Sequence, residues 1–138
     1  IDSYQIYESK MSGADAILLI VRMLTKAKLD DLLGLARELG LFCLVEAHDE
    51  QEMELALDCQ SLIVGINARN LQTFQVDLSA IERVAKLVPA DRILVAESGI
   101  QKREDVIRVQ KAGAKAVLVG TRLMTSSDNQ MIRKLVGA

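Results

Sequence analysis

The sequence predicts an α/β fold in which helices cover the outer face of a parallel sheet, and three observations lead to this prediction. Short β-branched runs alternate with amphipathic stretches at intervals of roughly 20 to 30 residues. The runs are almost continuously apolar, which is typical of strands in a sheet covered by helices. Three of the amphipathic stretches end at a glycine that leads straight into a new run, which indicates a repeated helix–strand unit.

Five runs have the length and the composition of buried strands. They are Ala16–Val21, Phe42–Glu46, Leu62–Asn67, Ile93–Glu97 and Ala116–Gly120.

The stretches between the runs carry apolar residues at steps of three and four, the spacing of a helix with one buried face. Asp49 and Asp77 stand where N-caps belong, and Gly13, Gly40 and Gly113 follow helical segments where a left-handed residue is favoured. Tyr4 and Tyr7 lie three residues apart on a further, N-terminal helix, and we expect both to pack. The other predicted helices span Lys26–Leu39, Glu50–Leu57, Leu78–Leu87 and Arg103–Ala112.

The composition is that of an ordinary globular protein and excludes several classes of partner. The chain has 138 residues, of which 50% are hydrophobic and 26% charged, and its net charge is −2. The basic residues are scattered, so we expect no nucleic-acid partner and no membrane-surface partner. The most apolar run is too short to cross a bilayer, which needs about 20 residues. With one proline, Pro89, no linker, and no cysteine framework, we expect residues 1–138 to form a single cytoplasmic domain.

Two architectures fit the strand–helix alternation: an open, doubly wound sheet and a closed barrel. Strand periodicity gives the second, third and fourth runs an apolar face that ends in one polar residue, Glu46, Asn67 and Glu97 respectively. Barrels place active-site side chains at these carboxyl ends, above layers of apolar residues. No G-x-G-x-x-G turn of an open dinucleotide-binding sheet occurs. We therefore favour a barrel.

Glu46 and Glu97 are the candidate acid–base groups. Each ends an apolar strand, where loss of water can raise the pKa of a carboxylate toward the range useful for proton transfer. A single such residue is as often a solvent-facing strand end, but two on strands of one sheet are harder to explain in that way.

Asn67 and Arg69 are candidate substrate contacts. The Asn67 amide can donate to a hydroxyl or ring group, and the Arg69 guanidinium can bind an anion. The structural alternative is that Asn67 turns the chain and that Arg69 forms a surface ion pair.

A phosphate site is predicted after the last two strands, at Ser98, Gly99, Gly120 and Thr121. Glycines let backbone amides approach an anion, a following helix adds partial positive charge, and barrels commonly bind phosphate with these two loops. The simpler alternative for either glycine alone is a turn.

His48 is the chain's only histidine, and we interpret it as a solvated residue at the start of a helix rather than as a catalytic group. No second histidine or cysteine stands at metal-ligand spacing from it. We therefore expect no metal site.

These segments together resemble the indole-3-glycerol phosphate synthase family over nearly the whole chain. The resemblance implies a (β/α)8 barrel that closes the ring of 1-(2-carboxyphenylamino)-1-deoxyribulose 5-phosphate, with loss of carbon dioxide and water and without a cofactor. This lyase reaction belongs to tryptophan biosynthesis. The segments that carry the resemblance are residues 1–8 (IDSYQIYE), 13–20 (GADAILLI), 44–50 (LVEAHDE), 65–71 (GINARNL), 96–100 (AESGI) and 117–124 (VLVGTRLM).

Residue by residue, the resemblance implies that Glu46 is an acid–base carboxylate and that Asn67 and Glu97 position the substrate. The phosphate would be held at the loops already named. Thr121 stands where the family usually has serine or glutamate, and Ala68 replaces the second asparagine of Asn-Asn-Arg. Related phosphate-binding barrels with other reactions share the last two loops, but we do not expect them to carry the segments around Glu46 and Asn67.

The resemblance also implies that this chain corresponds to strands 4 to 8 of the barrel. In the family, a Lys-Asp-Phe strand that carries the general-acid lysine comes directly before the position of Ile1. Lys10, Lys26 and Lys28 occupy helix or loop positions, so none of them can be assigned the role of that lysine. We therefore expect the chain alone to lack activity. The alternative is a non-catalytic half-barrel that binds phosphate and associates, with itself or a complementary piece, through the exposed edges Ala16–Val21 and Ala116–Gly120.

Overall fold

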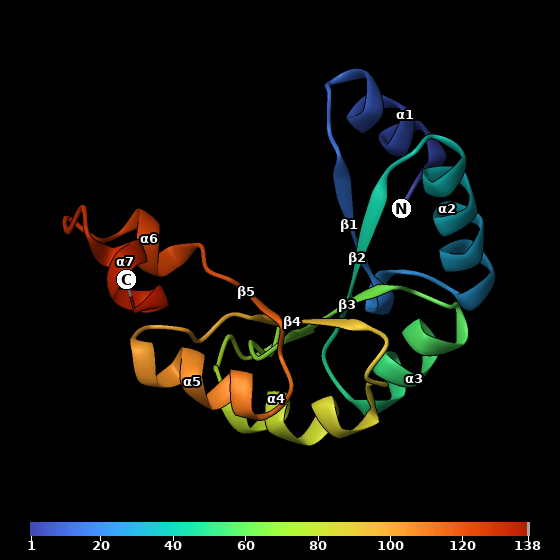
Figure 1. The fold of residues 1–138 in the computed structure, drawn as a ribbon. Helices are drawn as coiled ribbons and strands as arrows, with labels where there is room; N and C mark the ends of the chain where they lie inside the picture. Colours follow the sequence, from blue (N-terminus) through green and yellow to red (C-terminus); the bar gives the residue numbers. More distant parts are fainter. Residues whose placement is uncertain (138) are drawn as a thin grey trace.

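The computed structural model describes residues 1–137 and contains one five-stranded parallel sheet with the order β1-β2-β3-β4-β5 (Figure 1). Every strand pairs with the next strand in the sequence, which is the strand order of a (β/α)8 barrel, and β1 and β5 are the unpaired edges. The strands are β1 Ala16–Ile20, β2 Phe42–Ala47, β3 Ile63–Asn67, β4 Ile93–Glu97 and β5 Ala116–Leu118. All five agree with the predicted strands to within two residues at each end.

The helices that precede β5 in the sequence lie along the convex side of the curved sheet, the two that follow it lie beyond its end, and the concave side stays open (Figure 1). The α-helices are α1 Ser3–Met11, α2 Lys26–Glu38, α3 Glu50–Asp58, α4 Leu78–Val84, α5 Arg103–Lys111, α6 Thr121–Met124 and α7 Met131–Val136, and 3₁₀ turns occupy η1 Val21–Met23 and η2 Ala85–Leu87.

The core lies between the sheet and the helices. The strand residues that face the helices, such as Val45, Val64 and Ala96, are completely buried. They pack with the apolar stripes of the helices, for example Leu29 and Leu32 of α2, in a single cluster. Burial of each of these leucines or valines contributes about 1.5–3 kcal/mol relative to an exposed position, so this outer layer holds the fold together.

The opposite, inner face of the sheet is largely exposed at its edges and near its amino end. Leu18, Phe42, Ile93 and Leu118 are 42%, 65%, 44% and 44% exposed. In a closed barrel these positions would form the packed interior layers. The sheet is therefore part of a barrel whose interior is open.

The predicted helix ends are confirmed at the residues that were named. Asp49 and Asp77 accept hydrogen bonds from the backbone amides of Glu52 and Ser79, as N-caps do. Gly13, Gly40 and Gly113 have positive φ angles of 83°, 67° and 113°. Among residues 1–137, none of the helices combines the length and the apolar character needed to cross a bilayer.

The prediction that Tyr4 and Tyr7 pack is wrong for this chain. Their side chains are 70% and 48% exposed, and the only buried residue of α1 is Ile6. The sequence spacing placed both tyrosines on one face of α1, but that face does not lie against the part of the sheet that the structure describes.

Candidate active site

The carboxyl ends of β2, β3 and β4 bring together the three predicted catalytic residues. The strand register places Glu46 beside Gly65 and Asn67 beside Glu97. Glu46 and Glu97 are only 6% and 3% exposed, although both are carboxylates. Such burial is expensive unless the groups are paired or protonated, so the cluster is a candidate for proton chemistry.

Asn67 links the strand ends. Its Nδ2 donates to Glu46 Oε1 at 3.1 Å, and its Oδ1 accepts from the Arg69 amide at 3.0 Å. The second bond fixes which end of the amide group faces Glu46, because the oxygen is already used. Asn67 therefore turns the chain, as the structural alternative predicted, and at the same time contacts the carboxylate.

Gly65 makes room for the carboxyl group of Glu97. A Cβ atom at position 65 would lie 1.8 Å from Glu97 Oε1, closer than any real contact allows. The Glu97 side chain thus leans over the β3 backbone in the direction of Glu46. Only a glycine at this strand position accommodates the observed placement.

Burial, followed by the charge of Glu46 and a hydrogen bond to it, raises the pKa of Glu97 to about 8. At neutral pH Glu97 is therefore a carboxyl group that keeps its proton. From the sequence we expected burial at a strand end to raise the pKa of such a carboxyl group, and for Glu97 this is confirmed.

The interpretation of His48 as a solvated residue is wrong. Its side chain is 4% exposed, and its Nε2 lies 3.2 Å from Glu46 Oε1. Its Nδ1 lies 3.0 Å from Glu52 Oε2. The acidic residues around it in the sequence suggested solvent exposure, but one turn of α3 folds Glu52 back onto the ring instead.

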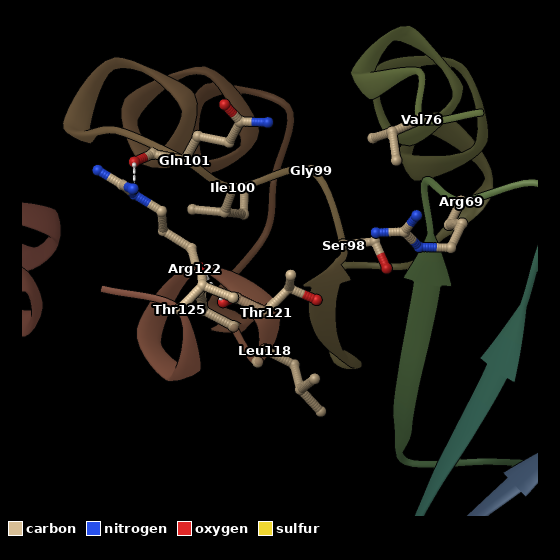
Figure 2. A pocket seen from close by; sticks show the side chains of 12 residues that line it. Arg69, Val76, Ser98, Gly99, Ile100, Gln101, Leu118, Thr121, Arg122 and Thr125 are labelled. Atoms are coloured by element: carbon tan, nitrogen blue, oxygen red, sulfur yellow. Dashed lines mark hydrogen bonds between the residues drawn. The ribbon is translucent and has the colours of Figure 1, made fainter. Parts of the chain in front are cut away.

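A cavity of about 450 Å³ opens beside Glu97, and all five residues predicted to bind substrate or phosphate line it (Figure 2). Arg69 comes from the loop after β3, Ser98 and Gly99 from the loop after β4, and Gly120 and Thr121 from the loop after β5. The Arg69 guanidinium also donates to the Phe74 carbonyl oxygen at 3.2 Å, which holds it at the edge of the cavity.

The loop after β4 has an unusual backbone. Ser98 and Gly99 both have positive φ, 63° and 78°, and a Cβ atom on Gly99 would lie 2.6 Å from Val76 Cγ1. Two successive residues in this region turn the backbone sharply, the kind of geometry in which amides converge on an anion. The helix that follows this loop, α5, begins at Arg103 as predicted, so Ile100, Gln101 and Lys102 separate Gly99 from its start.

The loop after β5 behaves differently. Gly120 has a negative φ of −105° and caps α6, which begins directly at Thr121, so this loop is followed by a helix as we expected. Among residues 1–137, neither the Gly99 amide nor the Gly120 amide donates to a backbone or side-chain oxygen.

Arg122 is a cavity residue that the sequence analysis did not select. Its Nε donates to the Gln101 carbonyl oxygen at 3.3 Å, which joins the last two loops (Figure 2). With Arg69 it gives the cavity two guanidinium groups. The sequence signal that could have identified Arg122 is its position directly after Gly120 and Thr121.

A family model described as "Indole-3-glycerol phosphate synthase" matches residues 1–135. The chain belongs to the indole-3-glycerol phosphate synthase family.

Two curated relatives illustrate the match. An indole-3-glycerol phosphate synthase of Dehalococcoides mccartyi is 50% identical over 127 residues, covering 92% of this chain and 49% of the relative. One of Bacillus cereus is 52% identical over 129 residues, covering 93% of this chain and 51% of the relative. The chain thus spans about half the length of the curated synthases that it matches.

Solved structures agree on the fold of this family member. A tryptophan synthase complex from Pyrococcus furiosus contains a chain with a TM-score of 0.72 and 20% identity, covering 99% of this chain and 58% of that one. A structure titled "Native KDPGal structure" gives a TM-score of 0.73 at 15% identity, covering 99% and 64%. At these identities the likeness shows the fold alone, and it supports a partial (β/α)8 barrel.

Proposed function

We propose that this chain provides the acid–base carboxylates and the phosphate site of an indole-3-glycerol phosphate synthase. Its substrate would be 1-(2-carboxyphenylamino)-1-deoxyribulose 5-phosphate. The observation that carries the proposal is the convergence of Glu46, Asn67 and Glu97 at adjacent strand ends, beside a cavity lined by the two phosphate loops.

The two carboxyl groups suit the loss of water that completes the family's reaction. That step needs a proton delivered to a leaving hydroxyl and a base that takes a proton from the substrate. Glu97 is buried and has a raised pKa, so it can hold the proton to be delivered, while Glu46 is the neighbouring acceptor. Asn67 orients Glu46 through its 3.1 Å hydrogen bond.

The phosphate group would sit in the cavity between the last two loops. Ser98, Gly99, Gly120 and Thr121 offer backbone amides and two hydroxyl groups, and Arg69 offers a charge-assisted bidentate contact. Binding of inorganic phosphate followed by ³¹P NMR would test this placement, with Arg69→Ala as the weakened variant.

The complete site requires the rest of the barrel. In the family resemblance, the general-acid lysine lies on a strand before Ile1, and the lysines of this chain lie elsewhere. Lys26 on α2 pairs with Asp58 at 3.2 Å, and none of Lys10, Lys26 and Lys28 lines the cavity. We propose that residues 1–138 are one part of a single domain that three further βα units complete.

The chain alone should therefore show no indole-glycerol phosphate formation above background. The same chain joined to the N-terminal segment of the Bacillus cereus relative should show turnover, followed by the fluorescence of the indole product. Turnover by the chain alone would contradict the need for the lysine. A folded but inactive fusion would contradict the proposed function.

The open inner face favours a second property, association. Leu18 on edge strand β1 and Leu118 on edge strand β5 are exposed, and both edges are unpaired. We propose that the chain associates with itself or with a complementary half-barrel through these edges. If the chain binds phosphate and associates but the fusion stays inactive, a non-catalytic half-barrel is the better description. A cytosolic location, testable by cell fractionation, goes with the biosynthetic role.

A further inference from the structure

His48 lies just beyond the end of β2, and its buried ring spans two carboxylates. On one side, Nε2 lies 3.2 Å from Oε1 of Glu46. On the other, Nδ1 lies 3.0 Å from Oε2 of Glu52, and the His48 backbone amide donates to the same oxygen at 2.8 Å. Ring and backbone of His48 are thus both held by one carboxylate of α3.

Glu52 is itself fixed from two directions. Its backbone amide donates to Asp49 Oδ1 at 2.9 Å, and its Oε1 accepts from Arg22 Nε at 2.6 Å. Arg22 belongs to η1, the turn that follows β1, so the contact joins two successive units of the barrel. On the Nδ1 side, His48 is therefore held by a carboxylate that an ion pair and a helix cap fix in place, and not by solvent.

The contact between His48 and Glu46 belongs to the candidate active site and not to the start of α3. His48 Nε2 has no aligned hydrogen bond among residues 1–137, and a buried ring nitrogen in that condition is costly. Glu46 Oε1 is the carboxylate oxygen 3.2 Å away from it, and the same oxygen accepts from Asn67. Both contacts therefore act on the same oxygen of the Glu46 carboxylate.

We propose that His48 is a positioning residue that holds the Glu46 carboxylate in place by tying it, through Glu52, to Arg22. The proposal rests on the proposed function, because Glu46 acts there as an acid–base group. Turning the ring away would remove the contact between Glu46 and the Glu52–Arg22 pair and leave Glu46 with Asn67 and Glu97.

Two substitutions separate this role from a purely structural one, because each amide replaces one ring nitrogen. Glutamine at position 48 can place its amide nitrogen near the position of Nε2, toward Glu46, whereas asparagine can place its own near Nδ1, toward Glu52. In the fusion with the completing barrel segment, His48→Asn should lower kcat by about 10- to 100-fold with a much smaller change in KM. His48→Gln should keep most of kcat.

The reverse order, with His48→Asn more active than His48→Gln, would mean that His48 only holds the start of α3 and would overturn the proposal. Equal kcat values for the wild type and both variants would overturn it as well.

A second measurement on the 138-residue chain does not depend on activity. His48 is the only histidine, so its two ring nitrogens give the only imidazole signals in a ¹⁵N NMR spectrum. Glu46→Gln should shift the Nε2 signal, Glu52→Gln should shift the Nδ1 signal, and Glu54→Gln, on the exposed face of α3, should shift neither.

An Nε2 signal that stays unchanged in Glu46→Gln would overturn the contact, and with it the proposal, whatever the fusion does. An inactive wild-type fusion together with a shifted Nε2 signal would instead refute the proposed function and leave the His48–Glu46 contact standing.

Discussion

Folding changes the pKa of the Glu97 carboxyl group. In the unfolded chain its carboxyl group has an ordinary pKa near 4.5, whereas in the folded chain burial and the nearby Glu46 raise its pKa to about 8. At a pH between these two pKa values, folding is therefore accompanied by the uptake of a proton. The stability that this group contributes is fully present below about pH 4.5 and is lost as the pH rises toward 8.

Glu97→Gln should remove this pH dependence because an amide cannot ionise. We expect the free energy of unfolding of the wild type to fall more steeply between about pH 5 and pH 8, by up to about 1.4 kcal/mol per pH unit relative to the variant. Urea unfolding followed by circular dichroism at several pH values measures the difference. Glu54→Gln, at an exposed position, is the control and should keep the wild-type slope. Parallel curves for the wild type and Glu97→Gln would contradict the raised pKa.

At the scale of single residues, sequence reasoning found the groups that end strands and missed those whose roles depend on a neighbouring strand. Glu46, Asn67 and Glu97 could be selected because the alternation within each strand puts them on one face. The role of Gly65 follows from the side chain of Glu97 on the next strand, which no local pattern reports. The start of α3 at Glu50 was predicted, but no local pattern shows that the Glu52 side chain turns back onto the His48 ring instead of into solvent, so His48 was misjudged.

At the scale of elements, local signals determined where helices begin more firmly than where they end. The stretch Leu78–Leu87 was predicted as one helix, but α4 ends at Val84 and the chain continues as the 3₁₀ turn η2. The cause lies just downstream: Val88 precedes Pro89 and is extended, as residues before proline prefer. The 3₁₀ turn η2 therefore forms the transition between the end of α4 and the extended residue Val88.

The N-cap of α4 gives a test at this scale. Asp77 Oδ1 accepts from the Ser79 amide at 2.9 Å, and its Oδ2 accepts from the Ser79 hydroxyl group at 2.6 Å. Asp77→Ala should lower the free energy of unfolding by about 1 kcal/mol, because the amide loses its acceptor. Asp77→Asn keeps an acceptor oxygen and should lose much less. Chemical denaturation of both variants measures the pair, and equal losses would mean that charge rather than capping matters here.

At the scale of the whole molecule, the curved sheet has one face in the core and one face largely without a cover. Leu18 and Phe42 lie on adjacent strands of the uncovered face and are 42% and 65% exposed. A contiguous apolar face beside unpaired strand edges favours association. The sheet order, the family and the two exposed edge strands could be predicted from the sequence, but the exposure of single residues such as Phe42 could not, because it depends on how the folded sheet curves.

Leu18→Lys should weaken association of the chain. A charge on the inner face of edge strand β1 would have to lose water on pairing, and we expect the dimer dissociation constant to rise by about tenfold or more. Size-exclusion chromatography with light scattering over a range of concentrations measures it. Ile107→Lys places the same charge on the outer helix α5, at a similarly exposed position, and should have little effect. A wild-type chain that stays monomeric throughout would contradict association.

Gly65 also determines how far apart two interacting acids can be in this sheet. Glu46 is on β2 and Glu97 is on β4, so their backbones are separated by two strand spacings, about 9.5 Å. Side chains that stand upright on strands so far apart usually have a third side chain between them. Here the middle strand contributes none, and the Glu97 carboxyl group occupies that volume. The interaction between the two carboxyl groups therefore crosses a whole strand, and the width of the site is set by the residue that has no side chain.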